Sequence, residues 1–358
     1  MNTLSFVEYV WIDGAQPTQQ VRSKARLLDL PADFDLGDFP NWSFDGSSTN
    51  QAVGDSSDCI LKPIRVYDDP LRTPNDVIVL CEVLNPDGSP HASNQRAVLQ
   101  DAIRRAGGDL QPWLGFEQEY TLFRSGRPLG FPVNGYPEPQ GPYYCGAGSS
   151  VVYGRKIAEA HARACLDAGV LIYGINAEVM PGQWEFQVGF RGVPDEPCDA
   201  LTVADDVWLA RYLLHRVGED FDVDVSFDNK PVKGDWNGAG MHTNFSTSRT
   251  RNPETGMVAI QQIIDALEAC HEEHIANYGD RLAERLTGNH ETCDINTFRS
   301  GVAHRGASIR IPQSVAIDGY GYLEDRRPGA NADPYRVAKG LVSAVRSIPA
   351  ATAGTRAA

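Results

Sequence analysis

Hydrophobic and polar positions along the chain follow two patterns, one typical of strands and one typical of helices. The run 77–84 is almost wholly apolar and rich in β-branched residues, which predicts a buried strand. Turn-forming residues gather in 85–95 before helical spacing begins, so the chain is expected to divide there. We therefore predict an α+β protein with a small N-terminal β domain over 1–90, a larger domain over 95–350 and a disordered, low-complexity tail over 351–358.

Three longer stretches beyond the expected boundary have the spacing of amphipathic helices. They cover residues 155–169, where Gly169 is the expected stop signal, 196–218 and 256–279. The last stretch contains HEEH at 271–274, which we interpret as a solvated helix face rather than a metal site. Short strands are expected between these helices, and they carry the polar residues that suggest a function.

Composition narrows the class of function. The 358 residues include 32 Lys and Arg against 47 Asp and Glu, a net charge of −15, which argues against a nucleic-acid partner or an anionic membrane surface. No apolar run reaches the roughly 18 residues that a membrane span needs, and the N-terminus lacks the basic lead-in of a signal peptide. Seven cysteines without a CxxC pair predict reduced thiols rather than a zinc knuckle. A cytoplasmic enzyme is the expectation.

Glutamates at strand positions are the first candidate site residues. The segment 112–123 alternates with period two, so Leu114 and Phe116 share one face of the expected strand, while Glu117 and Glu119 share the other. A single pair of this kind is typical of a solvent-exposed face. Other expected strands and their turns carry further acidic, imidazole and amide side chains: Glu178, Glu185, His242, Asn244 and Glu324.

If these side chains converge in space, they need cations. Two carboxylates about 4 Å apart repel each other by roughly 4 kcal/mol at an effective dielectric constant of 20. Carboxylate oxygens with one imidazole suit Mg²⁺ or Mn²⁺ better than zinc or copper. The five glutamates and one histidine are enough for two such ions with three ligands each. Convergence itself does not follow from the spacing.

Four arginines in the last quarter of the chain accompany these acids: Arg285, Arg305, Arg310 and Arg326. Each of them taken alone is typical of a protein surface. Divalent cations together with guanidinium groups are what phosphoryl transfer requires, because both neutralise the transferred group. The chain has no GxxxxGK[ST] loop and no HRD or DFG motif, which excludes P-loop and protein-kinase mechanisms at the level of motifs.

Longer motifs resemble those of a known family. In chain order, between residues 41 and 335, they are NWSFDGSSTNQA, PWLGFEQEYTL, GPYYCGAG, GINAEVMPGQWEFQVG, GDWNGAGMHTNFST, RLTGNHET, GVAHRGASIRIP and GYLEDRRPGANADPY. Together they resemble the signatures of eukaryotic-type (type II) glutamine synthetase over a whole subunit. The resemblance implies a β-grasp-like N-terminal domain, a catalytic α+β domain and a homo-oligomer, a decamer of two stacked pentameric rings with sites between subunits.

The activity implied by the resemblance is ATP-dependent ligation of ammonia to L-glutamate, which gives L-glutamine through γ-glutamyl phosphate. ATP is then a co-substrate, and two or more Mg²⁺ or Mn²⁺ ions serve each site. The resemblance assigns the ion nearer the transferred phosphate to Glu117, His242 and Glu324. It assigns the second ion to Glu119, Glu178 and Glu185.

The resemblance also gives roles to the remaining candidates. It assigns the substrate glutamate to Asn237, Gly238, Arg285 and Arg326. It assigns the nucleotide to Asn244, Phe245, Ser246 and Arg310, and places Arg305 near both ATP and glutamate. Asp45 resembles the acid that binds ammonium and takes up its proton, and Glu291 resembles the flap residue that closes over the intermediate. Asp45, Glu291 and Arg305 form the expected catalytic set.

Several residues depart from the family pattern: Phe190, Cys293, Arg299, His304 and Gln313. None has an assigned metal or nucleotide role, but several lie near the flap and Arg305 in the sequence. Two alternatives therefore stay open. One is a related ligase that joins glutamate to another amine, or a glutamate analogue to ammonia; the other is a catalytically silent structural homologue. Asp45 and Glu291 favour ammonia as the acceptor, and the six filled metal-ligand positions disfavour a silent homologue.

Overall fold

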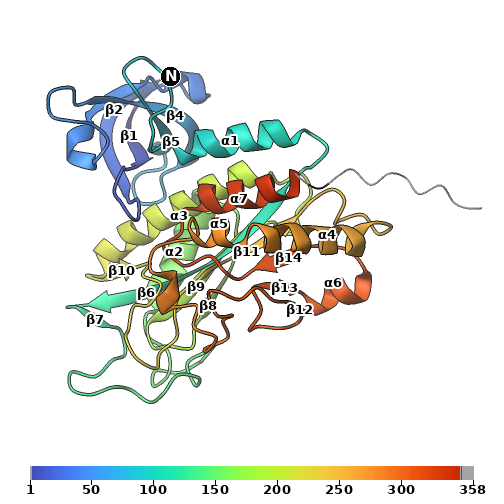
Figure 1. Ribbon diagram of the computed structural model, residues 1–358. Helices are drawn as coiled ribbons and strands as arrows, with labels where there is room; N and C mark the ends of the chain where they lie inside the picture. The colour runs from blue at the N-terminus through green and yellow to red at the C-terminus, as the bar shows by residue number, and fades with distance from the viewer. Residues whose placement is uncertain (1, 347, 349–358) are drawn as a thin grey trace, which may run out of the picture.

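The computed structural model describes residues 2–346 and 348, and it contains two sheets in separate parts of the chain (Figure 1). The N-terminal part is a five-stranded sheet in the order β2-β1-β5-β4-β3. The rest is a larger sheet with helices packed on it. The structure thus has the predicted α+β class. The predicted disordered tail over 351–358 lies outside the described residues.

The N-terminal sheet has a core of its own. Its strands are β1 (Thr3–Ile12), β2 (Val21–Leu30), β3 (Trp42–Asp45), β4 (Asp58–Asp68) and β5 (Val77–Leu84), with the short helices η1 (Leu36–Asp38) and η2 (Gly46–Thr49). Alternate residues of β1, including Val7, Tyr9 and Trp11, pack into this core, whereas Val10 joins the core of the larger part. Strand β5 has the predicted bounds and pairs with β1 in parallel at the centre of the sheet.

The larger sheet has nine strands in the described part of the chain. Seven follow the order β12-β13-β14-β11-β6-β9-β8, and β7 and β10 pair with β6. The strands are β6 (Trp113–Arg124), β7 (Arg127–Pro128), β8 (Ile172–Ala177), β9 (Gln183–Gly189), β10 (Asp224–Ser226), β11 (Met241–Ser246), β12 (Ser300–Val302), β13 (Ile309–Ile311) and β14 (Leu323–Asp325).

Helices pack on this sheet and against one another. They are α1 (Gln95–Ala106), α2 (Arg155–Asp167), α3 (Ala200–Asp220), α4 (Gly256–Ala269), α5 (His271–Ile275), α6 (Gln313–Asp318) and α7 (Pro334–Arg346), with the short η3 (Leu282–Glu284). Helices α3 and α7 lie on the side that also faces the N-terminal domain, while the long loops gather on the other side (Figure 1). Among the described helices none is long and apolar enough to cross a bilayer.

The predicted helix over 256–279 is divided at Cys270 into α4 and α5. The prediction of a solvated HEEH face is wrong for its two histidines. His274 is buried, and Nδ1 of both His271 and His274 accepts a hydrogen bond from the buried Arg327 guanidinium, at 3.2 and 3.1 Å. Arg327 in turn is paired with Asp325 on β14, so this motif supports a strand of the large sheet from behind.

One face of β6 carries residues of the apolar core, and the other carries candidate site residues. Phe116, Tyr120 and Leu122 point into the main apolar core, which they share with α3. Because side chains alternate along a strand, Glu117 and Glu119 are turned to the opposite face. The functional groups therefore stand on a sheet that is held rigid by its packed side.

Candidate active site

Strand register brings the candidate ligands together in rows on one face of the large sheet. Glu119 on β6 lies directly opposite Glu185 on β9. Two residues back along β6, Glu117 lies opposite His242 on β11. Directly opposed residues, and residues two apart on one strand, share a face of the sheet. The convergence that spacing alone could not predict therefore follows from the pairing of β9, β6 and β11.

A third row continues the pattern across β14 and β13. Glu324 lies opposite Asn244 on one side and Arg310 on the other. The Arg310 guanidinium contacts the Glu324 carboxylate at 2.7 Å, and the Asn244 amide donates to Glu117 Oε1 at 2.8 Å. These contacts link the third row to the second.

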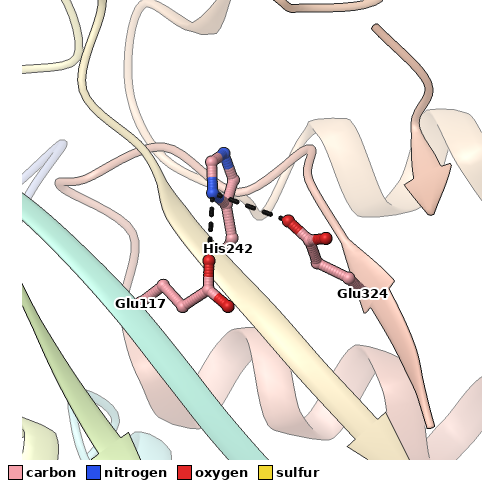
Figure 2. Close-up of side chains that lie close together, drawn as sticks. All are labelled: Glu117, His242 and Glu324. Carbon is pink, nitrogen blue, oxygen red and sulfur yellow. Dashed lines mark ion pairs between the residues drawn. The ribbon is translucent and has the colours of Figure 1, made fainter. Parts of the chain in front are cut away.

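Three side chains from three strands point toward one another in Figure 2: Glu117, His242 and Glu324. His242 Nδ1 lies 3.5 Å from Glu117 Oε2 and 3.8 Å from Glu324 Oε1. Their ligand atoms all lie within 4.8 Å of one another, as do those of a second group: Glu119, Glu185 and His242. The first group is the trio that the family resemblance assigns to one ion.

Glu178 is placed differently from the other acids. It lies one residue beyond β8, where the Asn176 amide donates to its Oε1 at 3.0 Å. It lines the same cavity as Glu119 and Glu185 but lies outside the 4.8 Å group that those two form with His242. The structure thus keeps the second predicted trio in one cavity without drawing it as close together as the first.

Burial and mutual repulsion make the cluster costly without a cation. Burial raises the pKa of Glu178 to about 8, with the charge of Glu119 as the next cause. Burial, followed by the charge of Glu117, holds the pKa of Glu185 well above its usual range. Burial also raises the pKa of Glu119, although nearby Arg285 opposes this. Oxygen ligands, an imidazole and buried carboxylates that repel one another together fit Mg²⁺ or Mn²⁺.

Burial, helped by the charge of Arg326, lowers the pKa of His242 well below its ordinary value. The imidazole is therefore neutral at physiological pH, which is the form that binds metals. His242, the one nitrogen donor of the set, is therefore also in a form that can bind a divalent cation.

Arginines form the opposite wall of the site. The buried Arg285 has its Nη2 3.0 Å from His242 Nε2 and donates to the backbone carbonyl of Arg326. Arg326 is ion-paired with Glu324, and its Nε donates to the carbonyl of Arg305 at 2.8 Å. The Arg305 side chain contacts Glu291 at 2.6 Å, and both are about half exposed.

Close backbone approach makes room for Arg285. A Cβ atom on Gly240 would clash with Nη2 of Arg285, and one on Gly238 would lie 2.7 Å from its Cγ. The Gly240 amide also donates to Glu119 Oε2 at 2.6 Å. The NGAG run thus uses glycine to pack a guanidinium against the acids.

These groups line a cavity of about 300 Å³. The predicted residues on its wall are Glu117, Glu119, Glu178, Glu185, Asn237, Gly238, His242, Arg285, Glu291, Arg305, Arg310, Glu324 and Arg326. Tyr144, Asn176, Gln187, His290 and Thr292 line it as well and were not predicted. Asn176 and Gln187 stand two residues from Glu178 and Glu185, so the period-two spacing used for the acids could have found them.

A second, mostly apolar cavity of about 330 Å³ contains the other three predicted nucleotide residues: Asn244, Phe245 and Ser246. Its walls are aromatic, with Trp113, Tyr173, Phe190 and Tyr322. The Phe190 ring lies 5.3 Å from that of Trp113. Asn244 joins the two cavities, since its amide contacts Glu117. Phe190, one of the departures from the family pattern, is therefore a wall residue of a candidate site.

Asp45 is separated from both cavities. It ends β3 in the N-terminal sheet and is exposed. Hydrogen bonds from Ser47 and Ser48 hold its pKa below the usual range. It lines neither cavity in the described part of this single chain.

The predicted flap has an unusual backbone. His290 and Glu291 are consecutive non-glycine residues with positive φ, 49° and 62°. His290 Nε2 contacts Asp235 at 2.8 Å and its Nδ1 contacts Gln140, which ties the segment to two other loops. Such conformations persist only where neighbours enforce them and are frequent at functional sites. Cys293, which follows, is buried and donates to the carbonyl of Thr297.

An α+β fold that collects buried carboxylates, an imidazole and arginines beside an aromatic cavity is typical of enzymes that transfer phosphoryl groups with divalent cations. Family models agree with this and are more specific. Residues 3–86 match the β-grasp domain of glutamine synthetase, and residues 92–347 match its catalytic domain. The chain belongs to the glutamine synthetase family, in its eukaryotic-type branch.

Named relatives show the same range of similarity. The chain is 52% identical over 348 residues to the chloroplastic glutamine synthetase of Chlamydomonas reinhardtii, and the aligned region covers 94% of this chain and 90% of the relative. It is 53% identical over 341 residues to the glutamine synthetase of Streptomyces viridochromogenes, with 94% of this chain and 95% of the relative aligned. It is 53% identical over 332 residues to the glutamine synthetase of Neurospora crassa, with 92% of this chain and 88% of the relative aligned. Because one relative is chloroplastic, the cytoplasmic location stays a prediction.

Proposed function

We propose that the chain is a glutamate–ammonia ligase, which joins ammonium to the side-chain carboxylate of L-glutamate and uses ATP to form γ-glutamyl phosphate on the way. Membership of the family over both domains carries this proposal. The acid, histidine and arginine cavity supports it, because acyl-phosphate formation requires charge neutralisation around the transferred group. The similarity to named glutamine synthetases does not favour the alternative of a ligase for another amine.

One divalent cation would be held by Glu117, His242 and Glu324, whose ligand atoms lie within 4.8 Å of one another. A second would be held by Glu119 and Glu185, with Glu178 completing its ligands from beyond β8. When bound, such ions neutralise phosphate oxygens and so make the terminal phosphoryl group of ATP a better electrophile. Removal of the ions leaves the raised-pKa carboxylates to protonate instead.

The remaining cavity residues would bind and orient the substrates. Asn237, Gly238, Arg285 and Arg326 would bind glutamate, with the guanidinium groups as partners for its carboxylates. Arg310 and Arg305 would neutralise phosphate oxygens from the opposite side of the acids. A carboxylate oxygen is a poor leaving group, and phosphorylation makes it a good one, so these residues would hold glutamate and ATP in line.

The aromatic cavity would take the base of ATP. Its flat walls at Trp113, Phe190 and Tyr322 suit stacking on a purine. Its junction with the acidic cavity at Asn244 would leave the phosphates pointing toward the metal ligands. Asn244, Phe245 and Ser246 would then contact the nucleotide as the family resemblance implies.

The flap would close the cavity over γ-glutamyl phosphate. Water that reached this intermediate would hydrolyse it, so exclusion of water has a purpose. Glu291 stands at the mouth, where its ion pair with Arg305 is half exposed and can be exchanged for a contact with a bound substrate. Two consecutive left-handed residues give this segment a backbone that differs from that of an ordinary loop.

Ammonium needs an acid that attracts it and takes up a proton from nitrogen before attack, and Asp45 would be that acid. Because Asp45 lines neither cavity of its own chain, the proposal places it in the site of a neighbouring subunit. This supports a homo-oligomer with shared sites, with the double pentamer as the expected form.

Mixed oligomers test the shared site. Asp45→Asn and Glu119→Gln subunits are each expected to be inactive alone. Reassembled one to one, they are expected to restore activity at about one quarter of the sites. A site is active only where an Asp45→Asn subunit supplies the intact Glu119 and its Glu119→Gln neighbour supplies the intact Asp45. Absence of any recovery in confirmed mixed oligomers would place Asp45 and Glu119 in the site of the same chain.

The activity itself is tested by phosphate release with ATP, Mg²⁺ and glutamate, comparing ammonium with alkylamines and polyamines. We expect glutamine and phosphate in equal amounts with ammonium and little turnover with the amines. Preferred turnover of an amine would replace the proposal by the related ligase. No turnover with any acceptor would leave the silent homologue.

A further inference from the structure

A third cavity lies where the two domains meet, and it shares no wall residue with the two already described. Its volume is about 290 Å³. The N-terminal domain contributes residues 18–21, and α3 contributes Trp208, Arg211 and His215, with Phe227 beyond β10. Cavities at domain junctions are frequent ligand sites, and this volume is near the lower end of their range. A small ligand would fill it.

Arg211 is the chemically unusual residue of this cavity. The residue is 4% exposed, and its guanidinium carbon lies over the rings of Trp208 and Phe227, 4.8 and 5.1 Å from their centroids. Among the described residues, no carboxylate lies within ion-pair distance of it. Its Nε and Nη2 donate to the amide oxygen of Gln118 and to the carbonyls of Ala330 and Ala332. In the described part of the chain, Nη1 has no such acceptor.

A buried cation without an ion-pair partner is costly, because neutral acceptors offset only part of the hydration that it loses. Burial lowers the pKa of Arg211 to about 10, so it stays charged at neutral pH. The buried carboxylate of Asp333 acts on Arg211 from beyond ion-pair distance and opposes this lowering. The cavity wall also carries Arg281, which is ion-paired with Asp228 at 2.6 Å and with Asp280 at 3.3 Å. Burial lowers the pKa of His215, which is therefore neutral.

We propose that this cavity binds a small organic carboxylate, with the carboxylate at Arg211 and the apolar body between Val21, Val225 and Phe227. A carboxylate would supply the ion-pair partner that Arg211 lacks, and the apolar side chains among the otherwise polar wall residues would contact its organic body. The acids on the wall would also accept an ammonium group, so both simple acids and amino acids have the required chemistry.

The position of Arg211 gives such a ligand a short route to the catalytic strand. Its partner Gln118 lies on β6 between Glu117 and Glu119. One buried amide therefore separates the cavity from the metal-binding face. The proposal does not depend on the proposed function, because the cavity and its buried arginine, which forms no ion pair among the described residues, exist whatever reaction the acidic face performs.

The test is titration calorimetry on the intact protein with four probes of similar size or charge: butyrate, 2-aminobutyrate, butyramide and inorganic phosphate. Val21→Trp fills the cavity from the N-terminal side. Val225→Phe fills it from β10, in case the first variant does not fold. Val258→Trp is the matched control, since Val258 is 63% exposed on α4.

We expect butyrate or 2-aminobutyrate to bind the wild type and Val258→Trp at this site, and to lose at least tenfold in affinity in a folded cavity-filling variant. The better of the two distinguishes a simple acid from an amino acid. Three results would overturn the proposal: no carboxylate binds, butyramide binds equally well, or binding is unchanged when the cavity is filled. Binding of phosphate alone would overturn it too. The variants also separate this site from the catalytic cavity, which they leave intact.

Discussion

Replacing Glu178 by glutamine is expected to stabilise the metal-free protein at alkaline pH, although the same change removes a proposed metal ligand. In the folded chain, burial and the charge of Glu119 raise the Glu178 pKa from 4.5 to about 8. The folded state therefore binds a proton more tightly than the unfolded state does. Its unfolding free energy falls as the pH rises from about 4.5 to 8, and it levels off above that range.

The size of the effect follows from the pKa. At about 1.36 kcal/mol per pH unit, a pKa raised from 4.5 to about 8 corresponds to a destabilisation of order 3–5 kcal/mol at pH 8.5 and to almost none at pH 4.5. Glutamine does not titrate and keeps an oxygen for the Asn176 amide. Glu178→Gln therefore gains most of this energy at pH 8.5 and nothing at pH 4.5.

Urea unfolding in EDTA at pH 5, 6.5 and 8.5 measures the difference between wild type and variant. Glu254→Gln is the control, because Glu254 is exposed and has no ion pair among the described residues. With saturating Mn²⁺ the order reverses, since the wild type then gains more from binding. Equal pH dependence of wild type and Glu178→Gln in EDTA would refute the reasoning, because the carboxylate would then be neither buried nor repelled.

Three further changes probe other parts of the site. Phe190→Ala is expected to raise the KM for ATP by about 2- to 12-fold with little change in kcat, since one aromatic contact contributes roughly 0.5–1.5 kcal/mol; steady-state kinetics that show a loss only in kcat would contradict a role in binding the base. Glu291→Gln is expected to release more phosphate than glutamine, because the open flap admits water to the intermediate, and a one-to-one ratio would count against it. Gly240→Ala displaces Arg285 and is expected to raise the KM for glutamate at least tenfold, while a normal KM would show that Arg285 does not contact glutamate.

Local patterns in the sequence were enough for some of the elements and for many of the site residues. The apolar run of β5 and the alternation of β6 are local properties of the chain, so both strands could be predicted. The acids were found because a carboxylate on an apolar strand is unusual. The aromatic walls at Trp113 and Tyr322 were missed, because an aromatic residue on a strand is most often part of a core.

What the sequence could not supply was register. The pairing of Glu119 with Glu185 and of Glu117 with His242 depends on contacts between strands far apart in the chain. The HEEH histidines show that a local pattern can also mislead. Their spacing on α5 is that of a surface helix, but a buried Arg327 from β14 requires acceptors, and both histidines provide them. A partner that is distant in the sequence cannot be recognised from the local spacing of residues.

The most direct test counts Mn²⁺ ions per chain, by electron paramagnetic resonance on the metal-depleted protein, in the wild type and in Glu119→Gln. We predict two bound ions per chain in the wild type and one in the variant, with glutamine synthesis lost together with the second ion. A wild-type chain that forms glutamine while it binds no Mn²⁺ or Mg²⁺, or a Glu119→Gln chain that keeps both ions and full activity, would contradict the account.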